Sequence, residues 1–266
     1  APPATATGLL VALLLVSGHP RAWRPALAAL WLVGLAAVLL LLGGGTAGLT
    51  PVATELWGGL PLTLLLTTGG IGLAFPLALA LALGRRSPWP LVRGLITAYV
   101  ELVRGLPLIP VLFLASFLLP LFLPPGTEVD VLFRVLAAIV LFAAAYLSET
   151  LRGGLAAVAP GQEQAARALG LSPRQALWLV VLPQALRATV PSLMNSAIAL
   201  FKDTSLVTVV SLFDLTGALT LALAGDAQWR PFYLEAYVFV AALYWLGCFG
   251  LSRYAAWIEA RLGISA

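Results

Sequence analysis

The sequence predicts an all-α, polytopic membrane protein, and three observations support this prediction. Of the 266 residues, 61% are hydrophobic and 10% are charged, whereas soluble domains are about 45–50% apolar and about 25% charged. Several uncharged stretches reach the roughly 20 residues that a helix needs to cross the hydrocarbon layer. The cations gather in a few of the segments between those stretches. The alternative, a large soluble helical core, is disfavoured by this composition.

Composition also narrows the chemistry. One His (His19) and one Cys (Cys248) exclude an intrachain disulfide and argue against a zinc site. The only lysine, Lys202, is followed by Asp203, so the chain has no G-K-[ST] phosphate loop. We therefore expect no catalytic residues, no metal site and no cofactor in this chain, and any ATP is hydrolysed on another chain. The net charge of +4 does not indicate nucleic-acid binding, because membrane proteins collect cations on cytoplasmic loops.

Six membrane spans are predicted from the uncharged runs. They are placed at about 26–42, 60–83, 106–123, 131–150, 190–215 and 235–256. Lys202 and Asp203 interrupt the fifth span. Residues 8–17 are too short to cross alone, so we interpret them as the remnant of a truncated helix or as a surface segment. Because the sequence begins with Ala1 rather than Met, we expect its N-terminus to be incomplete.

The distribution of cations predicts the orientation of these spans. The cytoplasmic side is assigned segments 84–105 and 151–189, the C-terminus, and the loop of Arg21 and Arg24. That side then holds 12 of the 15 cations, and the opposite side holds only Arg134 and Arg230. Segments 124–130 and 216–234 are therefore expected on the outer side of the membrane, opposite the cytoplasm.

Residues 151–190 form the longest polar stretch, and loops of this length usually carry function. Pro160 suits the first position of a helix. The run EQAARALG at 163–170 consists mostly of strong helix formers and ends at Gly170, a residue type common just after a helix. We expect a short helix that ends in a glycine turn.

A second helix is predicted directly after this turn. Ser172 and Gln175 have the spacing of a capping box, and Pro173 stands at the first helical position. This helix is expected to run through QALWLVV and to end at Leu182-Pro183.

The first of the two helices has a face of small residues, Ala165, Ala166 and Ala168. Small side chains let another backbone approach closely. The pair of helices is either a knob that docks a cytoplasmic partner or an amphipathic hairpin that packs on its own bundle at the membrane surface.

Residues 161–183, GQEQAARALGLSPRQALWLVVLP, resemble the EAA loop of binding-protein-dependent ABC importer permeases. The family pattern is E-A-A, three residues, G, nine residues and I-x-L-P, and it maps onto this stretch without a gap. The resemblance implies that the matching residues couple the chain to an ATPase: Gln164, Ala165, Ala166, Gly170, Leu182 and Pro183. Val180 replaces the family's Ile. Gln164 stands where the family usually has Glu, so it keeps hydrogen bonding but lacks the charge for a salt bridge to the ATPase.

The resemblance covers about residues 57–260. Residues 57–87, 98–109, 148–158 and 200–217 are similar to the polar amino-acid subfamily, and the whole pattern is most similar to a general L-amino-acid permease subunit. It implies the ABC importer type I permease fold, with five core spans plus at least one extra N-terminal span. Residues 1–56 would be a truncated N-terminal segment with one full span, and 57–260 the permease domain that contains the coupling loop.

The resemblance also implies a function and partners. Two permease chains, identical or homologous, form the pathway in the bacterial inner membrane. Two ATPase chains bind ATP and Mg²⁺ and power it, and a periplasmic or lipid-anchored binding protein delivers an amino acid. This chain is then a transport subunit rather than an enzyme, is surrounded by lipid, and has a cytoplasmic C-terminus.

Charged groups within a span are expensive and usually face a cavity, a partner or a substrate. Lys202 and Asp203 are neighbours in the sequence, so on a helix they point about 100° apart and cannot simply pair with each other. Thr204 and Ser205 add hydroxyls that can satisfy carbonyls freed by an unwound helix. The four residues either line the substrate pathway or belong to an interhelical network that fixes the bundle. A cation and an anion close together would suit a zwitterionic amino acid.

Two further charged pairs have i,i+3 spacing. Glu149 precedes Arg152 by three residues and either forms a local helix pair or lines the cytoplasmic half of the pathway. Glu101 and Arg104 repeat this spacing, and we expect them to pair at the start of the third span.

Three other functions are weighed against the importer. The first is an ABC importer permease that carries another small polar solute, such as an opine or a polyamine. An ion-coupled secondary transporter would need coupling through Lys202 and Asp203 and typically an internal repeat, and no convincing repeat is visible. A membrane-embedded enzyme would need an assembled nucleophile, base or metal site, for which one His and one Cys supply little.

Overall fold

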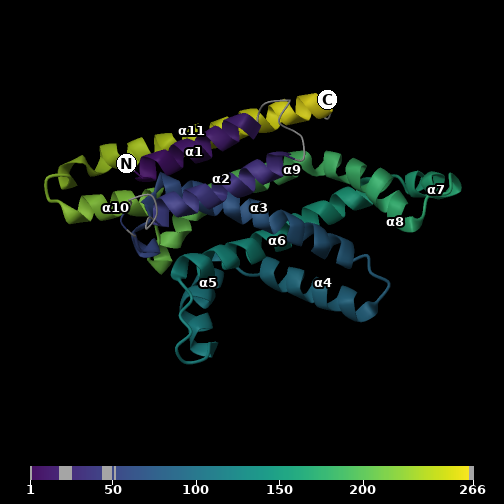
Figure 1. Ribbon diagram of the computed structural model, residues 1–266, viewed down its shortest axis with the longest axis horizontal. Helices are drawn as coiled ribbons and strands as arrows, with labels where there is room; N and C mark the ends of the chain where they lie inside the picture. The colour runs from purple at the N-terminus through teal and green to yellow at the C-terminus, as the bar shows by residue number, and fades with distance from the viewer. Residues whose placement is uncertain (1, 18–25, 44–49, 51, 264–266) are drawn as a thin grey trace. The chain divides into compact units, whose positions relative to one another are not determined.

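The computed structural model describes residues 2–17, 26–43, 50 and 52–263, and these are almost entirely helical (Figure 1). The predicted all-α class is confirmed. Arg21 and Arg24, assigned to a cytoplasmic loop, lie outside the described residues. The chain divides into two compact units, which are described in turn. The first contains Ala1–Gly70, Leu108–Ile139 and Leu200–Gly247, and the second contains Ile71–Pro107, Val140–Ala199 and Cys248–Ala266.

Within the described residues, four helical runs are long and apolar enough to cross a membrane: Leu60–Gly84, Val131–Ala157, Pro173–Val210 and Arg230–Leu262. A fifth candidate is a broken pair of helices, Pro90–Arg104 and Leu108–Phe122. Together with α2 (Ala26–Gly43), these runs give each of the six predicted spans a helical counterpart. The boundaries of the fifth span were nevertheless predicted wrongly, and a helix before the third span was not predicted.

The predicted third span, 106–123, is helical from Leu108 to Phe122, but a further helix precedes it. The chain already forms an amphipathic helix, α4 (Pro90–Arg104), in a stretch that was assigned to a loop. After Pro107 it continues as α5 (Leu108–Phe113), a π turn (Leu114–Leu118) and a 3₁₀ turn (Leu119–Phe122). Prolines at 107, 110 and 120 each lack a backbone donor, and such gaps bend a helix or change its hydrogen-bond register.

The fifth span begins earlier and ends earlier than 190–215. It comprises α8 (Pro173–Ala176), a π turn (Leu177–Val181), α9 (Leu182–Asp203) and a 3₁₀ turn (Thr204–Val210). The predicted end at Leu182-Pro183 is therefore wrong. A proline ring clashes with the carbonyl four residues before it in a regular α-helix, and the wider π turn in front of Pro183 relieves that clash. The run ends at Ser211, whose φ of 65° is left-handed.

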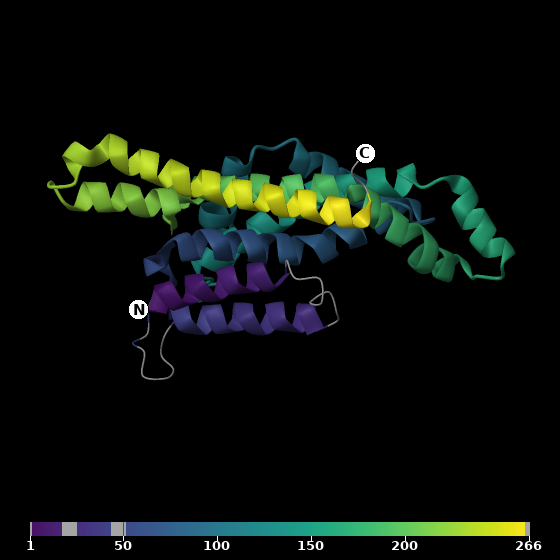
Figure 2. The same ribbon diagram turned by 90° about the horizontal axis from the view of Figure 1, so that it is seen from above.

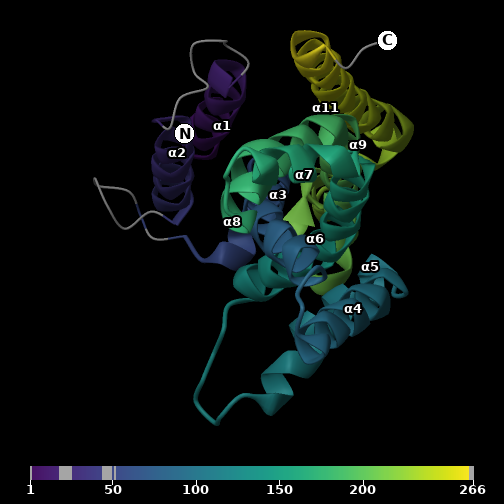
Figure 3. The ribbon, with the colours of Figure 1, turned by 90° about the vertical axis from the view of Figure 1, so that its right-hand side faces the viewer.

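In the first unit, α1 (Pro2–Ser17) and α2 lie side by side (Figures 2 and 3). Gly34 of α2 faces the Leu13 side chain so closely that a Cβ at residue 34 would clash with it. The segment 8–17 thus belongs to a 16-residue helix that packs on α2.

The first unit also contains a two-stranded parallel pairing of β1 (Gly58–Gly59) with β2 (Phe213–Asp214). A Cβ at Gly58 would stand 2.8 Å from the Phe213 carbonyl oxygen, so the pairing requires glycine there. Helix α10 (Leu215–Gly225) follows β2, and the Leu215 N–H donates to the Thr63 hydroxyl over 3.0 Å. This unit also contains the 3₁₀ turns Thr54–Leu56 and Arg230–Phe232 and the first part of α11 (Tyr233–Leu262).

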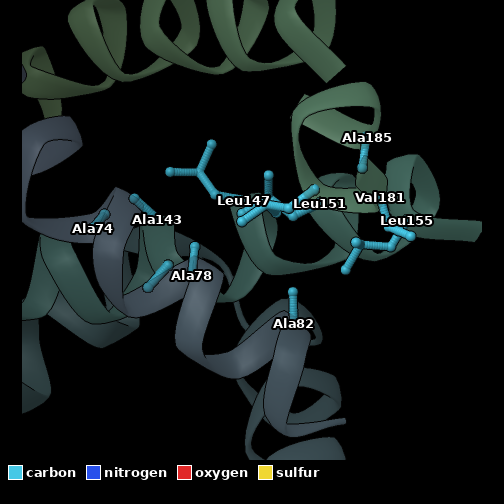
Figure 4. Packing of buried hydrophobic residues seen from close by; sticks show 11 residues of the cluster. Ala74, Ala78, Ala82, Ala143, Leu147, Leu151, Leu155, Val181 and Ala185 are labelled. Atoms are coloured by element: carbon cyan, nitrogen blue, oxygen red, sulfur yellow. The ribbon is translucent and has the colours of Figure 1, made fainter. Parts of the chain in front are cut away.

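The core of the second unit is formed by α3 (Leu60–Gly84), α6 (Val131–Ala157) and the run through α8 and α9 (Figure 4). Buried residues recur every fourth position, which places them on one face of each helix. They are Ala74, Ala78 and Ala82 on α3, Ala143, Leu147, Leu151 and Leu155 on α6, and Val181 and Ala185 on the third run. In lipid, helices associate by close packing rather than by hydrophobic burial, and small residues make that packing possible.

The closest approach in this core is at Gly154 of α6. A Cβ there would stand 2.8 Å from the Ala185 carbonyl oxygen and would overlap the Thr189 methyl group. Because the Ala185 backbone and the buried Thr189 side chain cannot both move away, the contact between α6 and α9 depends on glycine at position 154.

Candidate functional site

The predicted loop of 151–190 is a helical hairpin, shown in Figures 1 and 3 as α7 and α8. Helix α7 (Pro160–Ala168) begins with the predicted proline. It ends in a Schellman motif, in which the Leu171 N–H donates to the Ala166 carbonyl and the Gly170 N–H to the Arg167 carbonyl, over 3.2 and 3.0 Å. Gly170 has φ +88°, so the predicted glycine turn is confirmed and is left-handed.

The second half of the hairpin begins with the predicted capping box. The Gln175 N–H donates to the Ser172 hydroxyl over 3.3 Å, and the Ser172 N–H donates to the Gln175 side chain over 2.9 Å. Further along, the Gln184 amide donates to the Val180 carbonyl over 2.9 Å and to the Gln162 side chain over 3.3 Å. This last bond ties α9 back to α7, so the hairpin is held at its turn and at its base.

The predicted coupling residues do not all face the same way. Gln164, Ala165, Gly170 and Pro183 are exposed. Ala166 and Leu182 are buried, with 4% and 5% of their surface accessible. The small face predicted from Ala165, Ala166 and Ala168 is therefore split, because Ala166 points inward while its two neighbours point outward.

A charged cluster in the second unit surrounds Glu149. Its carboxylate accepts a hydrogen bond from Arg85, which directly follows α3, over 2.8 Å and one from Arg152 over 3.0 Å, and Arg104 of α4 lies 4.0 Å away. Arg85 also contacts Glu101 over 3.2 Å. Among the described contacts Glu101 and Arg104 do not pair with each other, so the predicted local pair is wrong: Glu101 contacts Arg85, and Arg104 lies near Glu149 of α6. Arg85 was missed as a site residue because its partners are remote in sequence.

Two tyrosines fasten α4 to α6 beside this cluster. The Tyr99 hydroxyl donates to the Leu141 carbonyl over 2.7 Å, and the Tyr146 hydroxyl donates to the Arg104 carbonyl over 3.2 Å. The cluster and these bonds hold the ends of three helices in one arrangement.

In the first unit, Lys202 and Asp203 lie where α9 gives way to a 3₁₀ turn. The expected use of the neighbouring hydroxyls is observed: Thr204 donates to the Phe201 carbonyl over 2.9 Å and Ser205 to the Lys202 carbonyl over 2.8 Å. Thr204 is fully buried, Lys202 is exposed and Asp203 is half-buried. In the part of the chain that is described, neither charged side chain forms an ion pair or a hydrogen bond.

Asp214 is a polar centre that sequence reasoning missed. Its buried carboxylate accepts hydrogen bonds from the Gly217 N–H over 3.0 Å, the Thr208 hydroxyl over 3.2 Å and the Tyr244 hydroxyl over 2.5 Å. It caps α10 and so fixes the chain just after the Lys202 segment. The signal was available locally, because Asp followed by a helix-compatible run is an N-cap pattern.

The fold is that of a multi-pass helical membrane protein. The chain belongs to the family of binding-protein-dependent transport system inner membrane components, which it matches over residues 74–264. It is thus part of a transport system rather than an enzyme.

Relatives within this family share much of the sequence. The chain is 48% identical over 221 residues to the inner membrane amino-acid ABC transporter permease protein YhdY of Escherichia coli (strain K12), covering 83% of this chain and 60% of that one. It is 45% identical over 214 residues to the glutamate/glutamine/aspartate/asparagine transport system permease protein BztC of Rhodobacter capsulatus, covering 80% of this chain and 49% of that one. The chain thus spans about half to three-fifths of the length of these two relatives.

Solved structures support the fold. An amino acid ABC transporter crystallised with histidines aligns with a TM-score of 0.69 and 30% identity, over 76% of this chain and 92% of that chain. The inward-facing MetNI methionine ABC transporter aligns with a TM-score of 0.54 and 21% identity, over 73% of this chain and 90% of that one, which is a likeness of fold alone.

Proposed function

We propose that this chain is the transmembrane permease subunit of an ATP-driven amino-acid importer. The observation that carries the proposal is the helical hairpin of residues 160–183, whose capped helices present an exposed surface that suits the docking of a separate ATPase. The names of YhdY and BztC, both amino-acid permeases, support the substrate class.

In this function the hairpin is the contact for a separate ATPase, which binds ATP and Mg²⁺. Gln164, Ala165, Gly170 and Pro183 lie on its exposed surface, and Ala166 and Leu182 anchor it from within. The Schellman turn and the capping box restrain the backbone of the hairpin. We therefore expect a movement of the bound ATPase to be transmitted through the hairpin to α6 and α9.

We further propose that the Lys202–Ser205 segment and Glu149 line the pathway, with a second permease chain completing it. Lys202 is the exposed cation on this segment, and it has no ion-pair partner within the described residues. A binding protein would deliver the amino acid, and the C-terminus would lie in the cytoplasm with the hairpin.

Reconstitution in proteoliposomes tests the proposal. The permease, its ATPase and its binding protein should take up a radiolabelled amino acid only with ATP, and a Walker-lysine substitution in the ATPase should abolish uptake. Uptake that persists with that substitution and collapses with an ionophore would support the secondary transporter instead. Uptake of a polyamine but of no amino acid would support an ATP-driven importer with a different substrate.

A further inference from the structure

A cavity of about 400 Å³ opens beside α7, at the base of the hairpin in the second unit. Its apolar floor includes Leu155 and Val181, and its polar wall is formed by Arg86, Glu163, Gln164 and Arg167. A volume of this size lies within the range of sites that hold a whole side chain or a small ligand.

The polar wall carries an excess of positive charge. Arg86 and Glu163 form a loose pair, with 3.7 Å between nitrogen and oxygen and with 45% and 38% of their side chains exposed. Arg167 lies one turn from Glu163 and Gln164, and within the described part of the chain its guanidinium has no hydrogen bond or ion pair. The Gln164 amide is equally free there. One complete guanidinium and one amide therefore face a partly open cavity without partners.

We infer that this cavity receives an acidic side chain of the ATPase, with Arg167 and Arg86 as the groups that recognise it. A guanidinium binds a carboxylate through two parallel hydrogen bonds, and the Gln164 amide can donate a third. The apolar floor would accommodate the methylene groups of an aspartate or glutamate. The inference rests on the proposed ATPase contact and adds which partner carries which charge. Because Gln164 is uncharged, the permease contributes the cations Arg86 and Arg167, and the ATPase contributes the acid.

The cavity lies at the base of the hairpin, between α7 and the ends of α3 and α6, so a side chain of the ATPase that docks on the hairpin is the occupant that we favour. Arg86, at the end of α3, and Arg167, on α7, would then clamp one carboxylate from two elements. Such a clamp would fix the position of the ATPase relative to the helix bundle as well as relative to the hairpin.

Charge reversal in the intact complex is the first test. In detergent at low salt, Arg167→Glu and Arg86→Glu should each lower recovery of the ATPase by about tenfold or more, since like charges placed face to face cost several kcal/mol. Arg93→Glu is the matched control, because Arg93 is an exposed cation on α4 of the same unit, outside the hairpin, and does not line the cavity. Its ATPase recovery should stay near that of the wild type.

A crosslink provides a second test that does not depend on destabilising the hairpin. Lys202 is the only lysine in the chain, so Arg167→Lys introduces a single new amine on α7. Treatment of the assembled transporter with a carbodiimide should then join this amine to one ATPase Asp or Glu through an amide bond, which mass spectrometry locates. Arg174→Lys should not link to that same residue.

Normal ATPase recovery in the double reversal Arg86→Glu/Arg167→Glu, or an intact Arg167→Lys complex that yields no crosslink to an ATPase acid, overturns the inference. If Gly170→Val loses the ATPase while these variants keep it, the hairpin docks as proposed and only the cavity's role fails. If the wild-type chain recovers no ATPase at all, the proposed function fails first.

Discussion

The Arg85 guanidinium donates to the Glu149 carboxylate over 2.8 Å, joining the turn that follows α3 to α6 across 64 positions of sequence. Only 13% of the Arg85 side chain and 23% of the Glu149 side chain are exposed. Arg152 approaches the same carboxylate from its own helix. One acid thus serves several cations, so its removal would leave them facing one another.

Glu149→Gln is therefore expected to destabilise the protein. Hydrogen bonds to charged groups contribute about 1.5–3 kcal/mol each, and the variant weakens two of them while the positive charges remain. The melting temperature in detergent should fall clearly. Glu101→Gln is the control: that side chain is 58% exposed, and an exposed pair is worth about 0–1 kcal/mol. Equal melting temperatures for the two variants would contradict the central role of Glu149.

Gly170→Val is expected to impair docking of the ATPase. A β-branched residue is strongly disfavoured at φ +88°, so the turn between α7 and α8 should distort. The protein should still insert, with normal abundance in the membrane and reduced ATPase recovery on affinity purification. Gly161→Ala, in the first turn of α7 and with open space around its Cβ position, should keep full recovery. Normal recovery and transport with Gly170→Val would count against the hairpin as the contact.

Gly154→Ala is expected to push α6 away from α9. The added methyl group meets the Ala185 carbonyl oxygen at 2.8 Å, and overpacking of this kind costs about 1–3 kcal/mol. Thermal unfolding should show the loss. Gly153→Ala provides a control one residue away, because nothing lies within 4 Å of its Cβ position. A melting temperature for Gly154→Ala as high as that of Gly153→Ala would refute the close packing.

The Lys202→Met variant tests whether Lys202 lines the substrate pathway or has a structural role. Because the side chain forms no ion pair in the described part of the chain, we expect normal membrane abundance and ATPase recovery with uptake reduced at least about tenfold. Lys202→Arg, which keeps the charge, should restore part of the uptake. Depletion of the protein from the membrane, reversed by neutralising an acid on another helix, would show instead that Lys202 has a structural partner.

The features that the sequence predicted correctly are those whose cause lies within a few residues. Pro160, Gly170 and the Ser172–Gln175 pair act on their own turn of backbone, and the structure places all of them as expected. The run past Pro183 was missed because a π turn upstream, and not the proline alone, decides whether the helix continues. The Glu149 cluster was only half predicted, since its i,i+3 partner is local and Arg85 is not.

The pairing of Gly58 with Phe213 has a consequence for biosynthesis. The two residues are separated by most of the permease domain, and translation adds about 5–20 residues per second. The first strand therefore waits roughly 8–30 s for its partner to leave the ribosome. During that interval Gly58, Gly59 and the Thr63 hydroxyl lack the partners that β2 and Leu215 supply in the finished chain. The pairing of β1 with β2 thus forms only after α3, α4 and α6 have been synthesised, so these earlier helices must insert and pack without it.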